Sequence, residues 1–462
     1  MSSTVYAHFI GIGGAGMSGI ARVLHDRGVV VTGSDLRESR YSHALREAGI
    51  PVAIGHAATN LGKPEVVVVS SAIPDSNPEL VEARKRELPI WPRAKMLAHL
   101  AGDRRTIAVA GTHGKTTTSS MVATMLAGLE LDPTYLIGGE VCGFGTNAAC
   151  GAGDYYVVEA DESDGSFLYL DPTVSVITNV EADHLDHYGT LAAVEEIFEE
   201  FAARTAPDGS VVVCADDDRA MAVAQSSGAR MVTYGCSAAA DVRCDDLRPT
   251  GTGHSFTVTL PGGVSCAASI MVPGTHNVLN ATACLAVAYA LGLDVAGAAG
   301  ALAGFAGVKR RFDEVGVAGG VRVIDDYAHH PTEVRATLAA ARAVGAARVS
   351  VVFQPHRYSR TAALATEFGA AFGDADRVIL MEVYSAGETP IPGVTGKTLV
   401  EELLLRDPRA RVTYLPHRSD IPAYLALSSR EGDLVITMGA GDVTALGPEI
   451  LRALTDEMEV TR

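Results

Sequence analysis

The segment GTHGKTTT, residues 111–118, has the residue types of a loop that binds a nucleoside triphosphate. Such loops hold phosphates through backbone N–H groups, place a lysine at the β- and γ-phosphates and offer a hydroxyl group to Mg²⁺. The segment follows the apolar run TIAVA and precedes a helical pattern. Val109 stands where the strict motif has its first glycine, so a purely structural turn is the alternative. We expect the phosphate contacts to come from Gly111, Thr112, His113, Gly114, Lys115, Thr116 and Thr117.

A second glycine-rich turn lies near the amino terminus. Gly11, Gly13 and Gly16 satisfy the spacing G-x-G-x-x-G between a strand-like run and a helical pattern. Glycines let the backbone turn tightly and approach a pyrophosphate, whose charge then meets the helix N-terminus. Asp35 ends the next strand-like run, at about the offset where a carboxylate accepts a ribose hydroxyl. The motif alone predicts a dinucleotide, and a glycine turn used only for tight packing is the alternative.

Acidic and imidazole side chains follow two further strand-like runs. Glu159 ends the run YYVVEA, and Asp183 and His184 come shortly after VSVITNV. The carboxyl ends of parallel strands meet at one edge of a sheet, where open α/β sheets bind ligands. A carboxylate and an imidazole at that edge can both reach a divalent ion that bridges phosphate oxygens. Solvated loop residues are the alternative interpretation.

The elements that position these groups alternate between strand-like and helical patterns along the whole chain. This order predicts α/β domains with mostly parallel sheets. We expect three: a Rossmann-like domain over residues 1–103, a central P-loop ATPase-like domain over 104–308 and a Rossmann-like domain over 309–462. In the central domain, the segment FTVTLPGGVSCAASIMVPG alternates around a Pro-Gly-Gly turn, which predicts an antiparallel hairpin added to the main sheet.

Composition narrows the class of protein. The 462 residues carry a formal net charge of −18, and no lysine or arginine run could neutralise a phosphate backbone, so nucleic acid and anionic membranes are poor partners. No apolar run reaches membrane-spanning length. The seven cysteines lack metal-site spacing, and an odd number argues against a secreted disulfide framework. We expect a cytoplasmic enzyme, monomeric or homodimeric, without a signal peptide.

Seven segments together resemble the ATP-dependent Mur ligases of peptidoglycan synthesis, in the same order across all three expected domains: GIGGAGMSGIA, VAGTHGKTTT, EADESDGSF, TNVEADHLD, GTHNVLNATA, DDYAHHPTEV and FQPHRYSRT. The resemblance implies that the first loop cradles the diphosphate of a UDP-sugar rather than a redox dinucleotide, and that the central loop holds ATP. It implies that ATP phosphorylates the lactyl carboxylate of UDP-N-acetylmuramate. The amine of L-alanine then attacks the acyl phosphate through a tetrahedral intermediate, with positioning and charge neutralisation supplying most of the rate.

The same resemblance assigns roles on the nucleotide side. It implies that Lys115 contacts the phosphates, that Thr116 ligates one Mg²⁺, and that Glu159 and His184 ligate a second. Asn280 matches an adenine-side asparagine, whereas Asn277 is better explained as a helix cap. An interdomain arginine aimed at the γ-phosphate and a ribose-contacting aspartate correspond to Arg311 and Asp326.

Substrate contacts are implied at both ends of the chain. For the UDP-sugar they are Gly11, Gly13, Gly14, Ala15, Gly16, Asp35, His56, Ser70 and Ser71. For L-alanine and the charge of the intermediate they are Tyr327, His329, His330, His356, Arg357 and Arg360, with the arginines fixing the amino-acid carboxylate. A buried turn is the alternative for the Tyr327–His330 stretch. Catalytic roles are implied for Lys115, His184, Arg311, His329 and Arg360.

One departure from the relatives concerns the metal site. Several Mur ligases hold Mg²⁺ with a carbamylated lysine in the central domain, but this chain has no lysine between Lys115 and Lys309. We expect no carbamate here. Glu196 is one candidate to replace its charge, and a solvated helix face is the other interpretation of that glutamate.

Three other functions remain open at this level. A nicotinamide-dependent dehydrogenase explains the first glycine loop and leaves GTHGKTTT without a role. A nucleotide-switch or binding protein would hold ATP without consuming it. A recycling ligase that adds a whole tripeptide to the same UDP-sugar differs only in the shape of its amine-side pocket.

Overall fold

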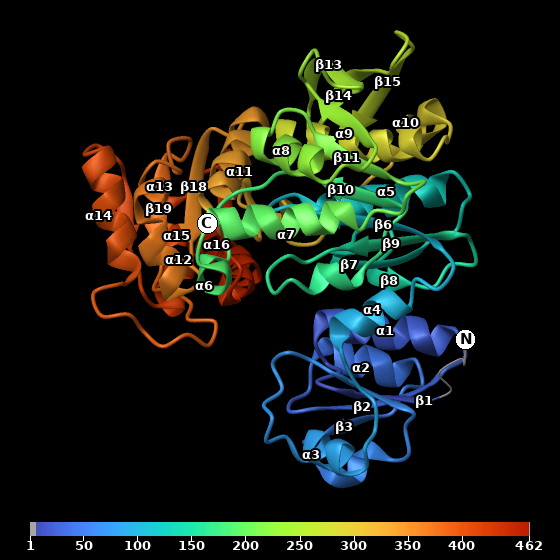
Figure 1. Cartoon of the computed structure of the whole chain (residues 1–462). Coiled ribbons are helices and arrows are strands. Elements are labelled where there is room, and N and C mark those ends of the chain that lie inside the picture. The colour runs from blue at the N-terminus through green and yellow to red at the C-terminus, as the bar shows by residue number, and fades with distance from the viewer. Residues whose placement is uncertain (1–5, 462) are drawn as a thin grey trace. The chain divides into compact units, whose positions relative to one another are not determined.

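The computed structural model describes residues 6–461 and contains three sheets, each covered by helices (Figure 1). Contacts within the chain divide it into two compact units. The first holds the residues up to 245 together with 257–268 and 279–303, and the second holds 246–256, 269–278 and the residues from 304 onward. The expected α/β class with three mostly parallel sheets is confirmed, while the three domain boundaries stay a prediction.

The amino-terminal sheet has five parallel strands in the order β3-β2-β1-β4-β5. This is the strand order of a Rossmann-type half, which places a ligand outside the carboxyl ends near the central strand β1. The strands are β1 (Tyr6–Ile10), β2 (Val30–Asp35), β3 (Val52–Ile54), β4 (Val66–Val69) and β5 (Ile90–Pro92). The helices are α1 (Ala15–Asp26), α2 (Arg40–Glu47), α3 (Pro78–Lys85), α4 (Arg93–His99) and the 3₁₀ turn η1 (Ala58–Leu61).

The central sheet has ten strands in the order β15-β14-β13-β12-β11-β10-β6-β9-β7-β8. Its strands are β6 (Arg105–Ala110), β7 (Thr134–Val141), β8 (Thr146–Ala149), β9 (Tyr155–Glu159), β10 (Val174–Ile177), β11 (Ser210–Cys214), β12 (Met231–Gly235), β13 (Val242–Thr250), β14 (Gly253–Thr259) and β15 (Ser265–Ile270). The helices are α5 (Lys115–Gly128), α6 (Leu185–Tyr188), α7 (Leu191–Ala203), α8 (Asp218–Ser226), α9 (Thr275–Ala290) and α10 (Val295–Leu302), with the 3₁₀ turn η2 (Ser166–Tyr169).

Two hairpins extend the parallel part of this sheet. The expected hairpin is β14 and β15, neighbouring strands joined by a tight turn in which Leu260 N donates to Val264 O at 2.8 Å. The antiparallel pair β7 and β8 at the other edge was not predicted, because its strand sequences TYLIGGEV and TNAA lack an alternating apolar pattern. Parallel pairing joins β9, β6, β10, β11 and β12, so the ends of β6, β9 and β10 share one edge.

The carboxy-terminal sheet has the order β16-β17-β21-β18-β19-β20, parallel apart from the antiparallel edge pair β16 and β17. Its strands are β16 (Asp313–Ala318), β17 (Val321–Asp326), β18 (Arg348–Phe353), β19 (Arg377–Leu380), β20 (Val412–Tyr414) and β21 (Asp433–Met438). The helices are α11 (Pro331–Ala343), α12 (Tyr358–Ala363), α13 (Ala365–Gly369), α14 (Gly396–Arg406), α15 (Ile421–Ser428) and α16 (Leu446–Thr461), with η3 (Arg418–Asp420) and η4 (Asp442–Ala445).

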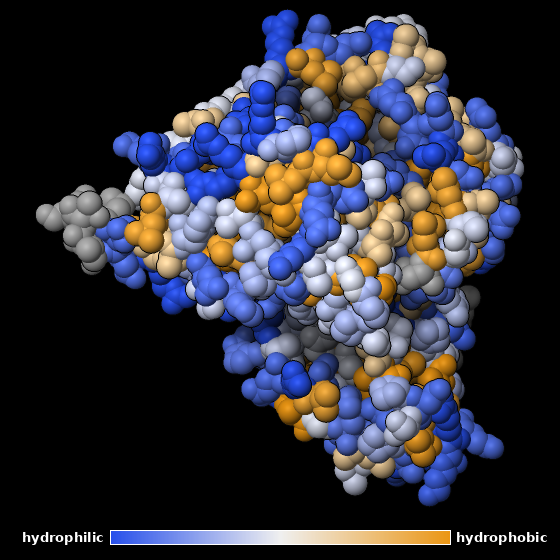
Figure 2. All heavy atoms as spheres, turned by 90° about the vertical axis from the view of Figure 1, so that its left-hand side faces the viewer, coloured by the Kyte–Doolittle hydropathy of each residue, from blue (hydrophilic) through white to orange (hydrophobic). Residues whose placement is uncertain are grey.

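Apolar strands form the core of each sheet because both of their faces are covered. In β1 and β6 the side chains of Phe9, Ile10, Ile107 and Val109 have no exposed surface. On the face drawn in Figure 2, polar side chains are interspersed with smaller apolar groups. Over residues 6–461 no helix has both the length and the apolar character needed to cross a membrane.

Candidate functional site

The loop between β6 and α5 has a backbone that only glycine permits at two positions. Gly111 has φ +131°, and a Cβ there would lie 2.0 Å from Thr178 Oγ1. Gly114 has φ +82°, and a Cβ there would lie 2.7 Å from Asn280 Oδ1. Because a side chain would collide at both places, both positions require glycine, and the chain turns there from β6 into the N-terminus of α5.

Residues after β10 hold this loop in place. Asn179 O accepts from Thr112 N at 3.0 Å, and Asn179 Oδ1 accepts from His113 N at 2.8 Å. The Thr112 hydroxyl oxygen accepts from Glu181 N at 2.8 Å, which ties the loop to the segment that carries Asp183 and His184. The loop is therefore preorganised by its neighbouring strand rather than by a ligand.

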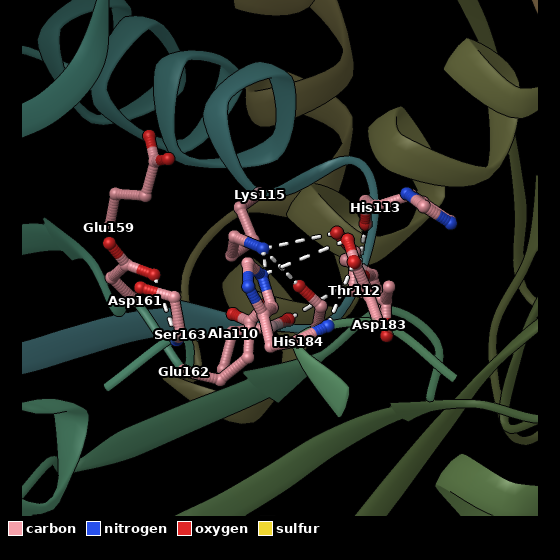
Figure 3. Close-up of polar contacts among 12 residues, drawn as sticks. Ala110, Thr112, His113, Lys115, Glu159, Asp161, Glu162, Ser163, Asp183 and His184 are labelled. Carbon is pink, nitrogen blue, oxygen red and sulfur yellow. Dashed lines mark hydrogen bonds and ion pairs between the residues drawn. The ribbon is translucent and has the colours of Figure 1, made fainter. Parts of the chain in front are cut away.

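Lys115 opens α5, and its ammonium group points back across the loop. Lys115 Nζ donates to Gly111 O at 2.6 Å, to Thr112 O at 3.1 Å and to Glu162 Oε1 at 2.8 Å. Burial acts to lower the pKa of Lys115, but the carboxylates of Glu162 and Asp161 outweigh it and the pKa is raised. Figure 3 shows Glu162 and His184 gathered around Lys115, while Glu159 stands apart from that group. Lys115 is thus a cation with only 15% of its side chain exposed, in the place where triphosphate charge is expected.

Glu162 is a site residue that the sequence analysis did not single out. Its side chain is 2% exposed, and its Oε2 atom is buried without a hydrogen-bond partner. Burial raises the pKa of Glu162 to about 7 despite the opposing charge of Lys115. The signal that could have found it is its place in EADESD, three residues after Glu159 at the same strand end. A carboxylate oxygen buried without a partner is uncommon, and a proton, a cation or a hydrogen-bond donor could complete it.

The residues expected to hold Mg²⁺ fall into two groups. Thr116 Oγ1 donates to Glu159 Oε1 at 3.0 Å, and Glu159 Oε2 accepts from Gly138 N at 2.7 Å. His184 Nε2 lies 3.7 Å from Glu162 Oε1 and 3.7 Å from Asp183 Oδ2. Hydroxyl and carboxylate oxygens are the ligands that Mg²⁺ prefers, so Thr116 and Glu159 fit it. Whether Glu159 and His184 share one ion stays a prediction, because His184 has Glu162 as its carboxylate neighbour.

Glu196 is exposed on α7, as the solvated interpretation predicts.

The start of α9 contributes the expected adenine-side residue. Asn280 is 7% exposed, and its Oδ1 accepts from Thr118 Oγ1 at 3.2 Å. Asn277 Nδ2 donates to Pro273 O at 2.7 Å, a local backbone contact in keeping with the structural interpretation of that residue. Thr117 is buried in the first turn of α5. Asn280 therefore reaches the phosphate loop itself, through Gly114 and Thr118.

The first glycine loop is braced by Asp35 rather than left open. Gly11 has φ +84°, and Gly13 N donates to Asp35 Oδ2 at 2.8 Å. The side chain expected to accept a ribose hydroxyl thus engages one of the loop's own N–H groups. At Gly16 a Cβ would lie 2.6 Å from Arg93 Nη1, so a guanidinium group from α4 covers the loop at that position. Gly14 is exposed and Ala15 is half-buried, which leaves this part of the loop accessible to an anion.

His56 belongs to a buried network that the sequence did not reveal. His56 Nδ1 lies 3.0 Å from Ser34 Oγ, and Ser34 Oγ donates to Glu79 Oε2 at 2.6 Å. Glu79 also accepts from Asn60 Nδ2 at 2.7 Å and lies 3.0 Å from His8 Nε2. Burial acts to raise the pKa of Glu79, but these hydrogen bonds outweigh it and lower the pKa to about 2. Glu79 is therefore a buried carboxylate that holds His56 in place through Ser34.

The two serines after β4 lie at the first glycine loop. A Cβ at Gly11 would lie 3.2 Å from Ser70 Cβ, and Ser70 N donates to Ile10 O at 3.3 Å. Ser71 is exposed at the end of the same strand. Both therefore lie at the carboxyl edge where the expected UDP-sugar would bind.

A cavity of about 90 Å³ in the first unit lies between the end of the first glycine loop and residues of β7, β8 and β9. Gly16 and Arg93 line it on the side of the amino-terminal sheet, and Gly138, Asn147 and Glu159 line it on the side of the central sheet. Asn147 Nδ2 donates to Ala15 O at 3.3 Å and so joins the two walls. The first glycine loop and the carboxylate of Glu159 therefore border one space.

The second unit brings together most of the residues expected on the amine side. The rings of Tyr327 and His329 lie 5.3 Å apart, those of His329 and His356 5.8 Å, and Tyr384 stacks on His356 at 5.7 Å. Arg360 Nη1 lies 3.3 Å from His356 Nδ1, and Arg360 is 9% exposed. Tyr384 is a member that the sequence analysis did not predict, since it comes from a distant loop. The cluster is cationic and aromatic, which suits a small carboxylate.

Around this cluster the other predicted residues take varied positions. Arg311 Nη1 lies 3.7 Å from Glu333 Oε1, and its guanidinium lies 5.1 Å from the centre of the Tyr327 ring. Asp326 accepts from Phe312 N and Ala328 N, both at 2.7 Å, and burial raises its pKa to about 6. His330 is the N-cap of α11, which is a structural task. Arg357 has φ +69°, a conformation rare outside glycine. A binding role for His330 and Arg357 stays a prediction.

Three mostly parallel sheets and two strand–glycine loop–helix units are the architecture of an α/β protein of the nucleotide-binding class. Family models match in the same order: "Mur ligase family, catalytic domain" over residues 6–105, "Mur ligase middle domain" over 109–288 and "Mur ligase, glutamate ligase domain" over 310–441. The chain belongs to the Mur ligase family.

Within the family, similar relatives carry one name. A UDP-N-acetylmuramate–L-alanine ligase of Acidothermus cellulolyticus is 49% identical over 452 residues, which is 97% of this chain and 94% of the relative. A ligase of the same name from Kineococcus radiotolerans is 50% identical over 456 residues, which is 97% of this chain and 96% of the relative. The crystal structure of the UDP-N-acetylmuramate-alanine ligase of Thermotoga maritima superposes with a TM-score of 0.81 at 31% identity, over 99% of this chain and 100% of that one.

Proposed function

We propose that this chain is an ATP-dependent ligase that joins L-alanine to the lactyl carboxylate of UDP-N-acetylmuramate in peptidoglycan precursor synthesis. The observation that carries the proposal is the cavity between the first glycine loop and Glu159. A UDP-sugar moored by its diphosphate at Gly11–Gly16 can extend its carboxylate into this space, where the terminal phosphate of ATP held after β6 would meet it. Such an arrangement places acceptor and donor together and favours in-line transfer.

Lys115 has the central task in the first step. In the described structure its ammonium group is neutralised by Glu162 at 2.8 Å. Triphosphate oxygens can take the place of that partner, so Lys115 would neutralise charge on the phosphoryl group as it moves to the substrate carboxylate. Backbone N–H groups at the start of α5 would hold the remaining phosphate oxygens. The product of this step is an acyl phosphate with a far better leaving group than a carboxylate has.

Thr116 would hold one Mg²⁺, and Glu159 and His184 would hold a second. Each ion supplies charge neutralisation between the phosphates when it is bound. The oxygen donors of Thr116 and Glu159 support this assignment, and their mutual hydrogen bond keeps them oriented toward one another. No carbamylated lysine is needed, because the chain has none to offer between Lys115 and Lys309.

The cluster in the second unit would serve the second step. Arg360 and Arg357 would bind the carboxylate of L-alanine, and His329 would lie near the amine that attacks the acyl phosphate. Arg311 would approach the γ-phosphate and Asp326 the ribose. Domain closure would exclude water from the reactive intermediate.

Identity to alanine ligases of 49–50% supports L-alanine over a tripeptide. A murein peptide ligase of Psychrobacter arcticus is also similar, with 25% identity and a TM-score of 0.72 over 98% of this chain and 99% of that one. The deciding assay measures phosphate release with ATP, Mg²⁺ and UDP-N-acetylmuramate while the amine is varied among L-alanine, glycine, L-serine and a tripeptide. We expect turnover to be fastest with L-alanine. Turnover with the tripeptide alone would refute the proposal.

The location and assembly follow from the chemistry of the substrates. ATP and UDP-sugars are made in the cytoplasm, and we place the reaction there. The chain would act as a monomer or homodimer, and described residues of a single copy line the cavity.

A further inference from the structure

Two cysteines of the central sheet face each other on neighbouring strands. The parallel strands β12 and β13 pair Tyr234 with Val242 and Gly235 with Arg243. One position further along, this register sets Cys236 opposite Cys244. Their Sγ atoms lie 3.0 Å apart, and both are free thiols. Neighbouring strands lie about 4.8 Å apart, within the Cα separation that a disulfide spans.

The loop between the two cysteines is fixed by contacts of its own. Asp216 accepts from Cys236 N at 2.7 Å and from Ser237 N at 2.8 Å. At the other end, Asp241 Oδ2 accepts from Thr233 N and Thr233 Oγ1, both at 2.8 Å. The two thiols are therefore held in contact by the backbone, so closing a bond needs the sulfur atoms to approach by only about 1 Å.

The two thiols differ in their access to solvent. Cys236 is exposed, whereas Cys244 is 2% exposed. Burial raises the pKa of Cys244 and shields it from a dissolved oxidant, so this thiol keeps its proton until Cys236 beside it has been oxidised. Cys236 is therefore the thiol accessible to a dissolved oxidant, and Cys244 is its buried neighbour.

We propose that Cys236 and Cys244 form a reversible thiol–disulfide site, with Cys236 as the thiol oxidised by a peroxide and Cys244 as the resolving thiol. Hydrogen peroxide transfers one oxygen to the Cys236 sulfur, its O–O bond breaks, and water leaves with a sulfenic acid in place. The Cys244 sulfur then attacks the Cys236 sulfur, the S–O bond breaks, and the Cys244 proton leaves with the oxygen as a second water. Contact between the sulfurs favours this step over further oxidation. The site lies apart from both ligand loops, so it protects Cys236 from irreversible oxidation without using the machinery of ligation.

The test is peptide mapping of the full chain after treatment with hydrogen peroxide and alkylation of the remaining thiols. In the wild type we expect a Cys236–Cys244 cross-linked peptide, a loss of two of the seven thiols and full recovery with dithiothreitol. C236S should keep all its other thiols and its ligation rate. C266S, a partly exposed cysteine on β15, is the matched control and should form the cross-link as the wild type does.

C244S is the sharper variant, because it keeps the exposed thiol and removes its partner. In C244S we expect Cys236 to proceed to sulfinic acid, which dithiothreitol does not reverse. The proposal is overturned if peroxide oxidises Cys236 in C244S while wild-type Cys236 and Cys244 stay free. It is also overturned if wild-type Cys236 is found linked to another cysteine or irreversibly oxidised. Since this assay needs neither ATP nor the UDP-sugar, its outcome is independent of the proposed ligase activity.

Discussion

The buried carboxylate of Glu79 gives a prediction whose size can be worked out. Its two oxygens contact His8, Ser34, Asn60 and the N–H of Ala57 at 2.6–3.0 Å. These contacts lower the pKa of Glu79 from 4.5 to about 2, against the raising effect of burial. At 1.36 kcal/mol for each pKa unit, the ionised form contributes about 3 kcal/mol to the stability of the folded state. We therefore expect Glu79→Gln to lower the free energy of unfolding by about 3 kcal/mol at pH 7.

The sign of the pH dependence follows from the depressed pKa. The contribution of Glu79 is fully present above about pH 4.5 and is lost as pH falls through about 2, because the folded state must then take up a proton. The stability gap between wild type and E79Q should thus be constant near neutral pH and should close between about pH 4.5 and 2. Calorimetric unfolding of both proteins across this range measures the gap directly.

A control variant on the same helix distinguishes the effect of losing a buried carboxylate from the effect of losing any negative charge. Glu82 lies on α3 with Glu79 and pairs with Arg86 at 2.7 Å on the surface. E82Q should leave the free energy of unfolding nearly unchanged, because this carboxylate is solvated. Because Glu79 also positions His56 through Ser34, E79Q should raise the KM for the UDP-sugar and leave the KM for ATP unchanged. An E79Q protein as stable as E82Q at pH 7, or a gap that persists at pH 2, would refute the reasoning.

Three further predictions concern the ligand loops. Gly111→Ala puts a Cβ 2.0 Å from Thr178 Oγ1 and should lower kcat/KM for ATP roughly 100-fold, whereas Gly143→Ala, with open space around it, should not. Glu162→Gln leaves the Lys115 charge without its carboxylate partner and should lower the free energy of unfolding by about 3 kcal/mol in the absence of ligand. A Mg²⁺–ATP analogue should restore this loss in melting experiments. Arg360→Lys should raise the KM for L-alanine roughly tenfold with the KM for ATP unchanged, and equal effects on both would contradict its placement.

Sequence reasoning succeeded where a function depends on neighbours along the chain. The strand–glycine loop–helix units around Gly11 and Gly111 were predicted because spacing, composition and flanking patterns all lie within about 20 residues. Glu162, Glu79 and Tyr384 were missed because their roles come from distant contacts. Glu162 contacts Lys115 47 positions away, Glu79 contacts Ser34 45 positions away, and Tyr384 stacks on His356 from another loop. Pairing of Cys236 with Cys244 depends on strand register, which composition does not reveal.

The strand pair β7 and β8 shows the same limit in the fold. Its edge position removes the need for a continuous apolar pattern, so no periodic signal marks it. Asp35 shows that a correct position does not determine a role, since its carboxylate braces Gly13 in the described structure.

The central claim is that the terminal phosphate of ATP moves to the carboxylate of the UDP-sugar before the amide forms. UDP-N-acetylmuramate labelled with oxygen-18 in its lactyl carboxylate tests this directly, with mass analysis of the released phosphate. An acyl phosphate requires one labelled oxygen in the phosphate for every amide made, and Lys115→Ala should make neither product. Amide formation with unlabelled phosphate would contradict the account.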